Sequence, residues 1–303
     1  MSVMALAIPA TFARSGGQER AMLISQINID PRNLWKATSY GRYEGQPLGA
    51  AKAMCGVDMD AYLLELRGKV LSGEVEQGKE TLHAEDLPDS FDAATNPAWA
   101  VCSAIISDIR DQSACGCCWA FGAAEAASDR MCIATGGKVA VPLSAQDMCF
   151  CGSKNGCKGG FPTTAWARIE EDGLVTGGQN HGLGPFGNSS GFCSAFTLPH
   201  CHHYGPVGHD PYPAEGSTGC PRVSASPVCP TECDAQARAP HADFAQDKYS
   251  FKGKLEHYPT VSSLMSAIMT GGPVETAFKV YEDFENYAGG IYHKTTSRSL
   301  GGQ

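Results

Sequence analysis

The sequence predicts an α+β fold, with helices through much of the chain and strands near its end. Three observations lead to this expectation. Residues 20–86 carry apolar positions at helical spacing, and residues 118–133 are rich in alanine and free of proline. Residues 274–280 and 290–293 have the composition of strands. Both kinds of element therefore contribute to the expected core.

The boundaries of the predicted elements follow from apolar spacing and from the residues that start and stop helices. Ser144 can cap a short helix as part of a capping box with Asp147, and Pro162 suits the first turn of another. Residues 72–80 are polar and contain glycine, which predicts an exposed loop open to proteolysis. Besides the short helix that follows Ser144, the predicted helices cover residues 21–28, 60–67, 118–133, 162–171 and 261–269.

Composition restricts the partners and the compartment. The chain has 23 basic and 32 acidic side chains, a net charge of −9, which disfavours nucleic acid and anionic membranes as partners. No apolar run is long enough to span a bilayer. Of the 14 cysteines, only Cys55 precedes Cys102; such clustering is typical of disulfides formed in an oxidising compartment, with buried free thiols in a cytosolic enzyme as the alternative.

Two further features bear on secretion. Asn188-Ser-Ser is a glycosylation sequon, which agrees with the secretory pathway. Residues 1–19 contain an apolar stretch with no basic residue before it, so they fit either a leader peptide or a disordered tail.

The segment 112–121, QSACGCCWAF, has the residues of a nucleophilic site. A thiol attacks only as its thiolate, and Cys118 opens a predicted helix whose N-terminal amides favour an anion. Gln112 can donate its side-chain N–H to an oxyanion, beside the backbone N–H of Cys118. With a neighbouring imidazolium, these groups would support peptide hydrolysis through a thioester.

Other interpretations of these cysteines stay open. Cys115 and Cys118 form a Cys-x-x-Cys pair, which suits a redox site or half of a zinc site. Residues 110–114 do not have the character of the strand that usually precedes a redox pair. Cys117 is interpreted as a spare thiol with no catalytic role. A zinc site would need further ligands from Cys149, Cys151 and Cys157.

Taken together, the motif and several longer segments resemble the papain family of cysteine peptidases, and within it the cathepsin B branch. Residues 115–119 fit the family motif except at Cys117, where Ser or Ala is usual. The match runs from about residue 27 to the end and includes GCKGGFPTTAW, GLVTGG, QDKYSF and GGPVETAFKVYEDFENYAGGIY. The resemblance implies a two-lobed, papain-like α+β fold, with a helical left lobe that starts at Cys118 and an incomplete β-rich right lobe.

The resemblance also implies a division of the chain. Residues 20–86 correspond to an inhibitory propeptide that fills the cleft until it is cleaved, with residues 33–37 as a docking segment, and residues 87–303 correspond to the peptidase domain. A stabilising N-terminal helical cap is the alternative for residues 20–86. Gly159 and Gly160 match the glycine pair that lets substrate backbone approach, although packing in a tight turn would also require glycine.

Residues 199–205 resemble the occluding loop of the cathepsin B branch. By resemblance, His202 and His203 would bind the terminal carboxylate of a substrate, and Asp111 would pair with the first of them. This arrangement implies removal of C-terminal dipeptides in addition to endopeptidase activity, with a preference that fades as the imidazoles lose their protons. The alternatives are exposed loop histidines or, together with Cys201, a metal site.

Disulfide pairs follow from the same resemblance. Cys229 would pair with Cys149 or Cys151 and leave the other one unpaired. The other implied pairs are Cys102–Cys132, Cys115–Cys157, Cys193–Cys233 and Cys201–Cys220.

The resemblance breaks at Gln303. Gly301-Gly302-Gln303 aligns with the family's Gly-Gly-His, whose His is the catalytic base, and the family's later Asn is not in this sequence. Three interpretations follow: an incomplete sequence of a working peptidase, an inactive relative that binds peptides or inhibits peptidases, and an unrelated disulfide-rich binding module. We expect no cofactor and no metal, a monomer acting on peptides, its own propeptide as inhibitor, and a lysosome-like or extracellular location.

Overall fold

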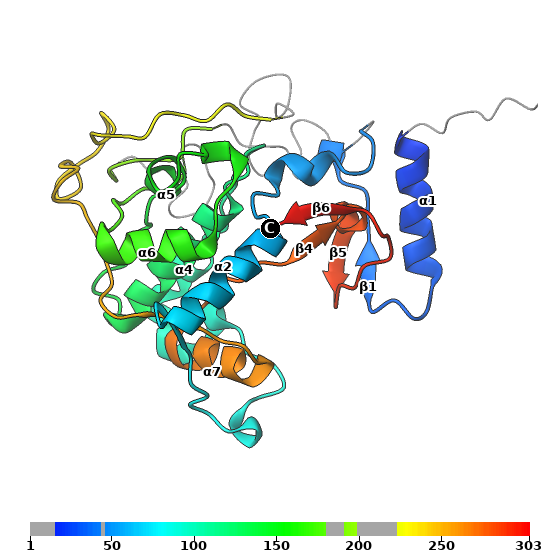
Figure 1. Cartoon of the computed structure of the whole chain (residues 1–303), viewed down its shortest axis with the longest axis horizontal. Helices are drawn as coiled ribbons and strands as arrows, with labels where there is room; N and C mark the ends of the chain where they lie inside the picture. The colour runs from blue at the N-terminus through cyan, green and yellow to red at the C-terminus, as the bar shows by residue number, and fades with distance from the viewer. Residues whose placement is uncertain (1–15, 44–45, 180–190, 199–222) are drawn as a thin grey trace, which may run out of the picture.

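The computed structural model describes residues 16–43, 46–179, 191–198 and 223–303 (Figure 1). Its helices are α1 (Gly16–Ile29), α2 (Met59–Ser72), α3 (Ser103–Ile106), α4 (Cys118–Ala134), α5 (Ala145–Cys151), α6 (Pro162–Glu171) and α7 (Val261–Gly271). Its strands are β1 (Trp35–Ala37), β2 (Val75–Gln77), β3 (Leu255–His257), β4 (Lys279–Tyr281), β5 (Tyr287–Gly290) and β6 (Ser299–Gly302).

The main core surrounds α4, which packs against α5 and α6. Small alanines such as Ala120, Ala123 and Ala124 are fully buried along α4 and let the neighbouring helices approach closely. Phe121 meets Phe196 edge to face with ring centroids 4.7 Å apart. Among the described helices, none is long and apolar enough to cross a membrane.

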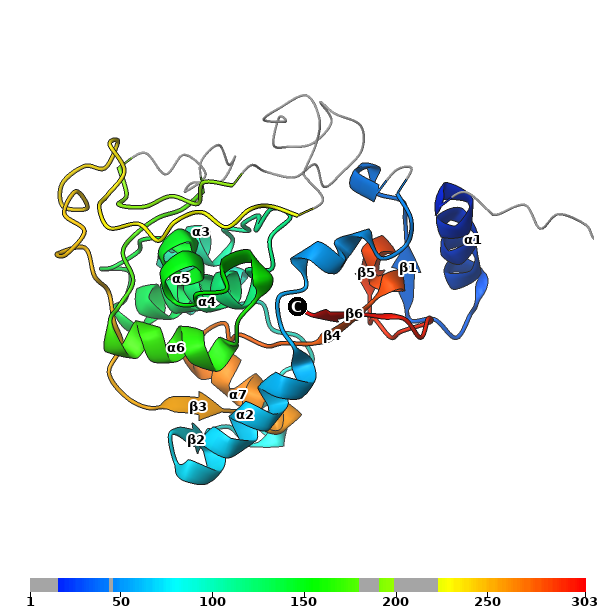
Figure 2. The ribbon, with the colours of Figure 1, turned by 45° about the horizontal axis from the view of Figure 1, so that its top comes forward.

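Two short ladders lie on the side of the molecule away from α4, α5 and α6, next to α1 (Figure 1). β1 pairs antiparallel with β5, and β4 pairs antiparallel with β6. Trp35 of β1 is 1% exposed and meets the ring of Tyr292 at 5.1 Å. An early segment of the chain is thus joined to its last part by backbone pairing and by an aromatic core. The chain end, marked C, lies between the helices and the ladders (Figures 1 and 2).

The predicted exposed loop at residues 72–80 is wrong in its middle. β2 pairs in parallel with β3, some 180 residues later in the chain, and Val75 is only 3% exposed (Figure 2). The polar residues around Val75 concealed the strand, because its partner is too distant in sequence to leave a local pattern.

The two predicted strands near the end are also wrong in their bounds. Residues 274–278 are not assigned to a strand, and β4 begins at Lys279. β5 ends at Gly290, so it shares only that residue with the predicted strand at 290–293, and its partner is β1. Ser144 caps α5 by accepting from the Asp147 N–H, but the Asp147 carboxylate accepts from Arg168 and Lys248 and does not complete a capping box.

A buried ion pair fastens α1 to the far end of the chain. Arg20 Nη2 lies 3.0 Å from Glu285 Oε2, and both side chains are almost fully buried. The guanidinium also donates to Asn286 Oδ1 at 3.0 Å and lies over the ring of Tyr43 at 5.1 Å. The other Glu285 oxygen accepts from the Ala51 N–H at 2.6 Å.

Replacement of one partner of this pair should be costly. Arg20→Met leaves the Glu285 carboxylate buried without its cation, so we expect a loss of about 3–5 kcal/mol in the free energy of unfolding, measured by urea denaturation. Arg32→Met removes the exposed partner of Asp30 and should cost no more than about 1 kcal/mol. Equal losses in the two variants would contradict this assignment.

Candidate active site

Cys118 stands at the first position of α4 and lies beneath another part of the chain. It is 8% exposed, and this burial raises the pKa of its thiol to about 11. The Gly56 N–H donates to the Cys118 sulfur at 3.3 Å. The hydrogen bonds from the Gly56 and Trp119 N–H groups favour the thiolate and so lower the pKa. Desolvation dominates in this state, so Cys118 is held as a neutral thiol.

The part of the chain above Cys118 is the covering segment, defined as residues 54–58. Its Gly56 carbonyl accepts from the Gly160 N–H at 3.0 Å. On the opposite side, Val57 exchanges two backbone hydrogen bonds with Gly302, at 3.1 and 2.9 Å. The covering segment therefore binds as an extended peptide, paired on both sides.

Glycines make this close approach possible. A Cβ added to Gly56 would lie 2.0 Å from the Gly116 carbonyl oxygen, and one added to Gly159, where φ is +108°, would lie 2.2 Å from the Gly56 oxygen. A Cβ on Gly160 would meet the Trp119 ring at 2.4 Å. Gly159 thus permits the close approach of the covering segment, and Gly160 permits packing against Trp119. The role of the pair toward a substrate stays a prediction.

Gln112 presents its side-chain amide to a carbonyl of the covering segment. Gln112 Nε2 donates to the Met54 oxygen at 2.8 Å and to the Cys115 oxygen at 2.7 Å. Its Oε1 accepts from Gln303 Nε2 at 2.7 Å. The Gln303 backbone exchanges two hydrogen bonds of 3.0 Å with Phe278, which continue the β4–β6 ladder. The structure therefore brings Cys118, Gln112 and Gln303 together around one bound peptide.

Asp111 lies close to this site and is buried. Its Oδ1 accepts from the Ser113 N–H at 2.6 Å, and its backbone N–H donates to Gln179 Oε1 at 2.7 Å. His202 and His203 lie outside the described residues, so their expected contact with Asp111 stays a prediction. The same holds for the Cys201–Cys220 pair and the Asn188 sequon.

The disulfides include three of the pairs that the resemblance implies. These are Cys102–Cys132, Cys115–Cys157 and Cys193–Cys233. Cys229 pairs with Cys151, which settles the alternative that the sequence left open.

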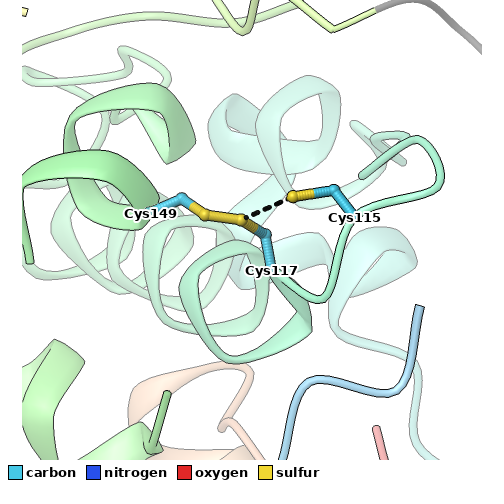
Figure 3. Close-up of side chains that lie close together, drawn as sticks. All are labelled: Cys115, Cys117 and Cys149. Carbon is cyan, nitrogen blue, oxygen red and sulfur yellow. Dashed lines mark hydrogen bonds between the residues drawn. A yellow bond between two sulfur atoms is a disulfide. The ribbon is translucent and has the colours of Figure 1, made fainter. Parts of the chain in front are cut away.

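A fifth disulfide joins Cys117 to Cys149, so two expectations were wrong: Cys117 is not a spare thiol and Cys149 is not left over. Cys117 precedes α4 and faces α5, with the two Cα atoms 5.8 Å apart (Figure 3). The only sequence signal for this bond was that Cys117 and one of Cys149 and Cys151 had no expected disulfide partner. It ties the start of the nucleophile's helix to the neighbouring helix.

The sulfurs of Cys115, Cys117 and Cys149 all lie within 4.8 Å of one another (Figure 3). Each is bonded in a disulfide, Cys115 to Cys157 and Cys117 to Cys149. A sulfur in a disulfide is not the thiolate that binds zinc. With these two disulfides formed, Cys115 and Cys117 fix the loop before Cys118 to the neighbouring segments.

Glu275 is a further ionisable group near Cys118 that the sequence did not indicate. It accepts from Trp166 Nε1 at 2.7 Å. Burial raises the pKa of its carboxyl to about 8, against the opposing effect of the Trp166 hydrogen bond. When charged, Glu275 disfavours the Cys118 thiolate and adds to the raised pKa of that thiol.

Comparisons with known proteins identify relatives over most of the chain. Residues 87–302 match the family model described as "Papain family cysteine protease". The chain is 34% identical over 290 residues to "Cathepsin B-like cysteine proteinase 6" of Caenorhabditis elegans, which covers 92% of this chain and 68% of the relative. It is 36% identical over 283 residues to a "Cathepsin B-like cysteine proteinase" of Schistosoma japonicum, covering 92% and 74%.

Solved structures show the same fold. "proCathepsin B S9 from Trypanosoma congolense" superposes with a TM-score of 0.62 at 24% identity, over 93% of this chain and 79% of that one. "Structure of digestive procathepsin L 3 of Tenebrio molitor larval midgut" gives a TM-score of 0.51 at 16% identity, over 95% and 73%.

A methyl group at Gly56 should uncover Cys118. Because it would clash with the Gly116 oxygen, we expect Gly56→Ala to lift the covering segment, reduce the burial of the thiol and lower its pKa. Alkylation of Cys118 by iodoacetamide, followed by mass spectrometry, should accelerate about tenfold for each unit by which the pKa falls.

Gly68→Ala is the matched control, since a Cβ there meets nothing within 4 Å. It should leave the alkylation rate at the wild-type value. A Gly56→Ala rate equal to that of wild type would show that the covering segment does not shield the thiol.

Proposed function

The chain belongs to the papain family of cysteine proteases, and from this membership we propose that it is a cathepsin B-like peptidase whose nucleophile, Cys118, is held latent by residues 20–86. The observation that carries the proposal is the bound covering segment. A peptide backbone lies across the Cys118 sulfur, with one carbonyl on the Gln112 amide. These are the contacts that a peptidase makes with a peptide substrate.

In the proposed reaction, the Cys118 thiolate attacks a substrate carbonyl carbon and forms a carbon–sulfur bond. Gln112 Nε2 and the Cys118 backbone N–H would stabilise the resulting oxyanion. Expulsion of the protonated amine leaves a thioester, which water hydrolyses. Gly160 and Gly302, which now bond the covering segment, would bond the substrate backbone in its place.

This reaction requires an imidazole near Cys118 to take up and return the proton. Gln303 stands at the position that the resemblance gives to that base, and a carboxamide does not accept a proton at neutral pH. The Gln303–Gln112 hydrogen bond therefore favours a second candidate function: a relative without hydrolytic activity that binds peptides or inhibits peptidases.

The proposed domain organisation places the inhibitory segment at residues 20–86 and the peptidase at residues 87–303, with a helical and a β-rich lobe. It is supported by the β1–β5 ladder and by the Arg20–Glu285 pair, which attach the early segment independently of the covered cleft. Residues 1–15 lie outside the described residues, and α1 begins at Gly16, ahead of the boundary proposed at residue 20.

We extend the proposal to dipeptidyl-carboxypeptidase activity through His202, His203 and Asp111. Its support is the resemblance of residues 199–205 to an occluding loop. Five disulfides among the described residues agree with the secretory pathway, and we propose a lysosome-like or extracellular destination for the chain.

Buried acids predict greater stability at acidic pH. Burial raises the pKa of Glu125 to about 8, of Asp129 to about 7 and of Glu275 to about 8. Their unfolded values lie near 4, so the folded chain holds protons that the unfolded chain has released. Stability from these groups is complete below about pH 4 and is lost as the pH rises through 7–8.

The measurement is the midpoint of thermal unfolding between pH 5 and pH 8. We expect it to fall with rising pH, and Glu125→Gln, which is neutral at every pH, to flatten the decline. Glu171→Gln, an exposed position on α6, should leave the slope unchanged. A slope that Glu125→Gln does not alter would contradict the assignment.

The proposed nucleophile is tested with a peptidyl acyloxymethyl ketone, applied to the full chain after limited proteolysis. We expect the probe to label Cys118, and Cys118→Ser to abolish labelling. Gln303→His should speed labelling at neutral pH by about tenfold or more, because an imidazolium beside Cys118 lowers the pKa of the thiol.

Gln303→Asn keeps the carboxamide and should react at the wild-type rate. Labelling that survives Cys118→Ser, or that Gln303→His does not accelerate, would contradict the proposed site. Peptide retention without hydrolysis, even in the histidine variant, would favour the binding function.

A further inference from the structure

Two free thiols lie on segments of the chain that contact each other. Among the described cysteines, Cys55 and Cys118 are the two that form no disulfide. Cys118 is the nucleophile of the proposed function, whereas Cys55 belongs to the covering segment and plays no part in that reaction. A free thiol in the segment that covers another free thiol, while ten other described cysteines form five disulfides, requires an explanation.

The backbone places Cys55 close to the Cys118 sulfur. Gly56 N lies 3.3 Å from Cys118 Sγ and is bonded to the Cys55 carbonyl carbon, so the Cys55 Cα lies at most about 6 Å from that sulfur. A disulfide needs the two sulfurs about 2.05 Å apart. The Cys55 sulfur now points toward Ala51, so the bond requires rotation of the Cys55 side chain together with a shift of the covering segment.

The surroundings of Cys55 leave room for such a rotation. Its sulfur now points toward the Ala51 oxygen at 3.8 Å, and the residue lines two open cavities of about 280 and 510 Å³. A Cβ on Gly301 would lie 2.9 Å from the Cys55 Cβ. The glycine therefore keeps space for the thiol beside the strand that leads to Gln303.

We infer that Cys55 and Cys118 form a dithiol site that a small disulfide, such as oxidised glutathione, converts into a Cys55–Cys118 cross-link. The half-buried Cys55 reacts first, since it lines the cavities through which a small disulfide can enter. Its thiolate attacks one glutathione sulfur, forms a mixed disulfide and releases one glutathione thiolate.

The Cys118 thiolate then attacks the Cys55 sulfur and releases the second glutathione. The two protons that the cysteines lose are taken up by the two released glutathione thiolates, and the two electrons of the cysteine pair reduce the glutathione disulfide to two thiols. Oxidised glutathione is the only oxidant that these steps need. Because the second step occurs within the chain, it needs no further access to the buried Cys118.

The environment of the site predicts how fast it reacts. Burial, together with the charge of Cys118, raises the pKa of the Cys55 thiol to about 12, and burial raises that of Cys118 to about 11. Both thiols are therefore mostly protonated at neutral pH. The rate of cross-linking should rise about tenfold per pH unit over the neutral to alkaline range.

The cross-link does not depend on peptidase activity. Its consequence does rest on the proposed function: a covering segment bonded to Cys118 would keep the nucleophile blocked even after the chain is cut beyond residue 78, until a thiol reduces the bond.

The test uses the full chain, treated with oxidised glutathione at about pH 9, where thiolates are more abundant, then alkylated and digested without reduction. Mass spectrometry should find a peptide that links Cys55 to Cys118, and dithiothreitol should remove it. After limited proteolysis at residues 78–86, denaturing non-reducing gels should show the early segment still attached, and reducing gels should show it released.

Cys55→Ser should abolish the linked peptide, and Cys118 should then be found as a free, alkylated thiol. Lys52→Cys combined with Cys55→Ser is the matched control, because it moves the thiol to an exposed position three residues away on the same segment and should give no link to Cys118. Stable glutathione on Cys55 without a cross-link, or equal linkage from position 52, would overturn the inference.

The two proposals fail separately. A cross-link in a chain that never labels with the peptidyl probe would refute only the peptidase function. Cys118 labelling without any Cys55–Cys118 link would refute only the dithiol site.

Discussion

The close approach of the covering segment to Cys118 is the constraint on which the rest of the site depends. Residues 54–58 reach the sulfur only because glycines stand at positions 56, 116 and 159, where a single methyl group would collide with backbone. Once there, the segment is paired with Gly160 on one side and Gly302 on the other. The same geometry that would hold a substrate peptide is thus filled by the chain itself.

Burial under this segment sets the electrostatics of the site. The helix N-terminus and three backbone N–H groups favour a thiolate at Cys118, yet desolvation outweighs them and keeps the thiol neutral. The segment does not rely on these local contacts alone. The buried Arg20–Glu285 pair and the β1–β5 ladder anchor the chain before it, and the β2–β3 pair anchors the chain after it. The position of the covering segment is therefore held by several independent attachments.

Local patterns predicted the local structure well and the distant pairings poorly. The alanine-rich run from Cys118 and the Pro162–Glu171 helix have the predicted extents within a residue, because capping and propensity act over a few positions. The β2–β3 pair was missed because each strand is stabilised by a partner far away in sequence. The Cys117–Cys149 bond was missed for a similar reason, since it depends on how α4 packs against α5. Resemblance to a family supplied three of the disulfides and two alternatives for a fourth. It also indicated Cys118 as the nucleophile, but it did not indicate the free thiol at Cys55.

Hydrogen exchange at the Gly160 and Gly302 amides tests the central claim most directly, because both amides donate to the covering segment. The account predicts strong protection of both amides in the intact chain and fast exchange after residues 20–86 are removed, while amides inside α4 keep their protection. Equal exchange at Gly160 and Gly302 before and after removal would show that the segment does not occupy the cleft.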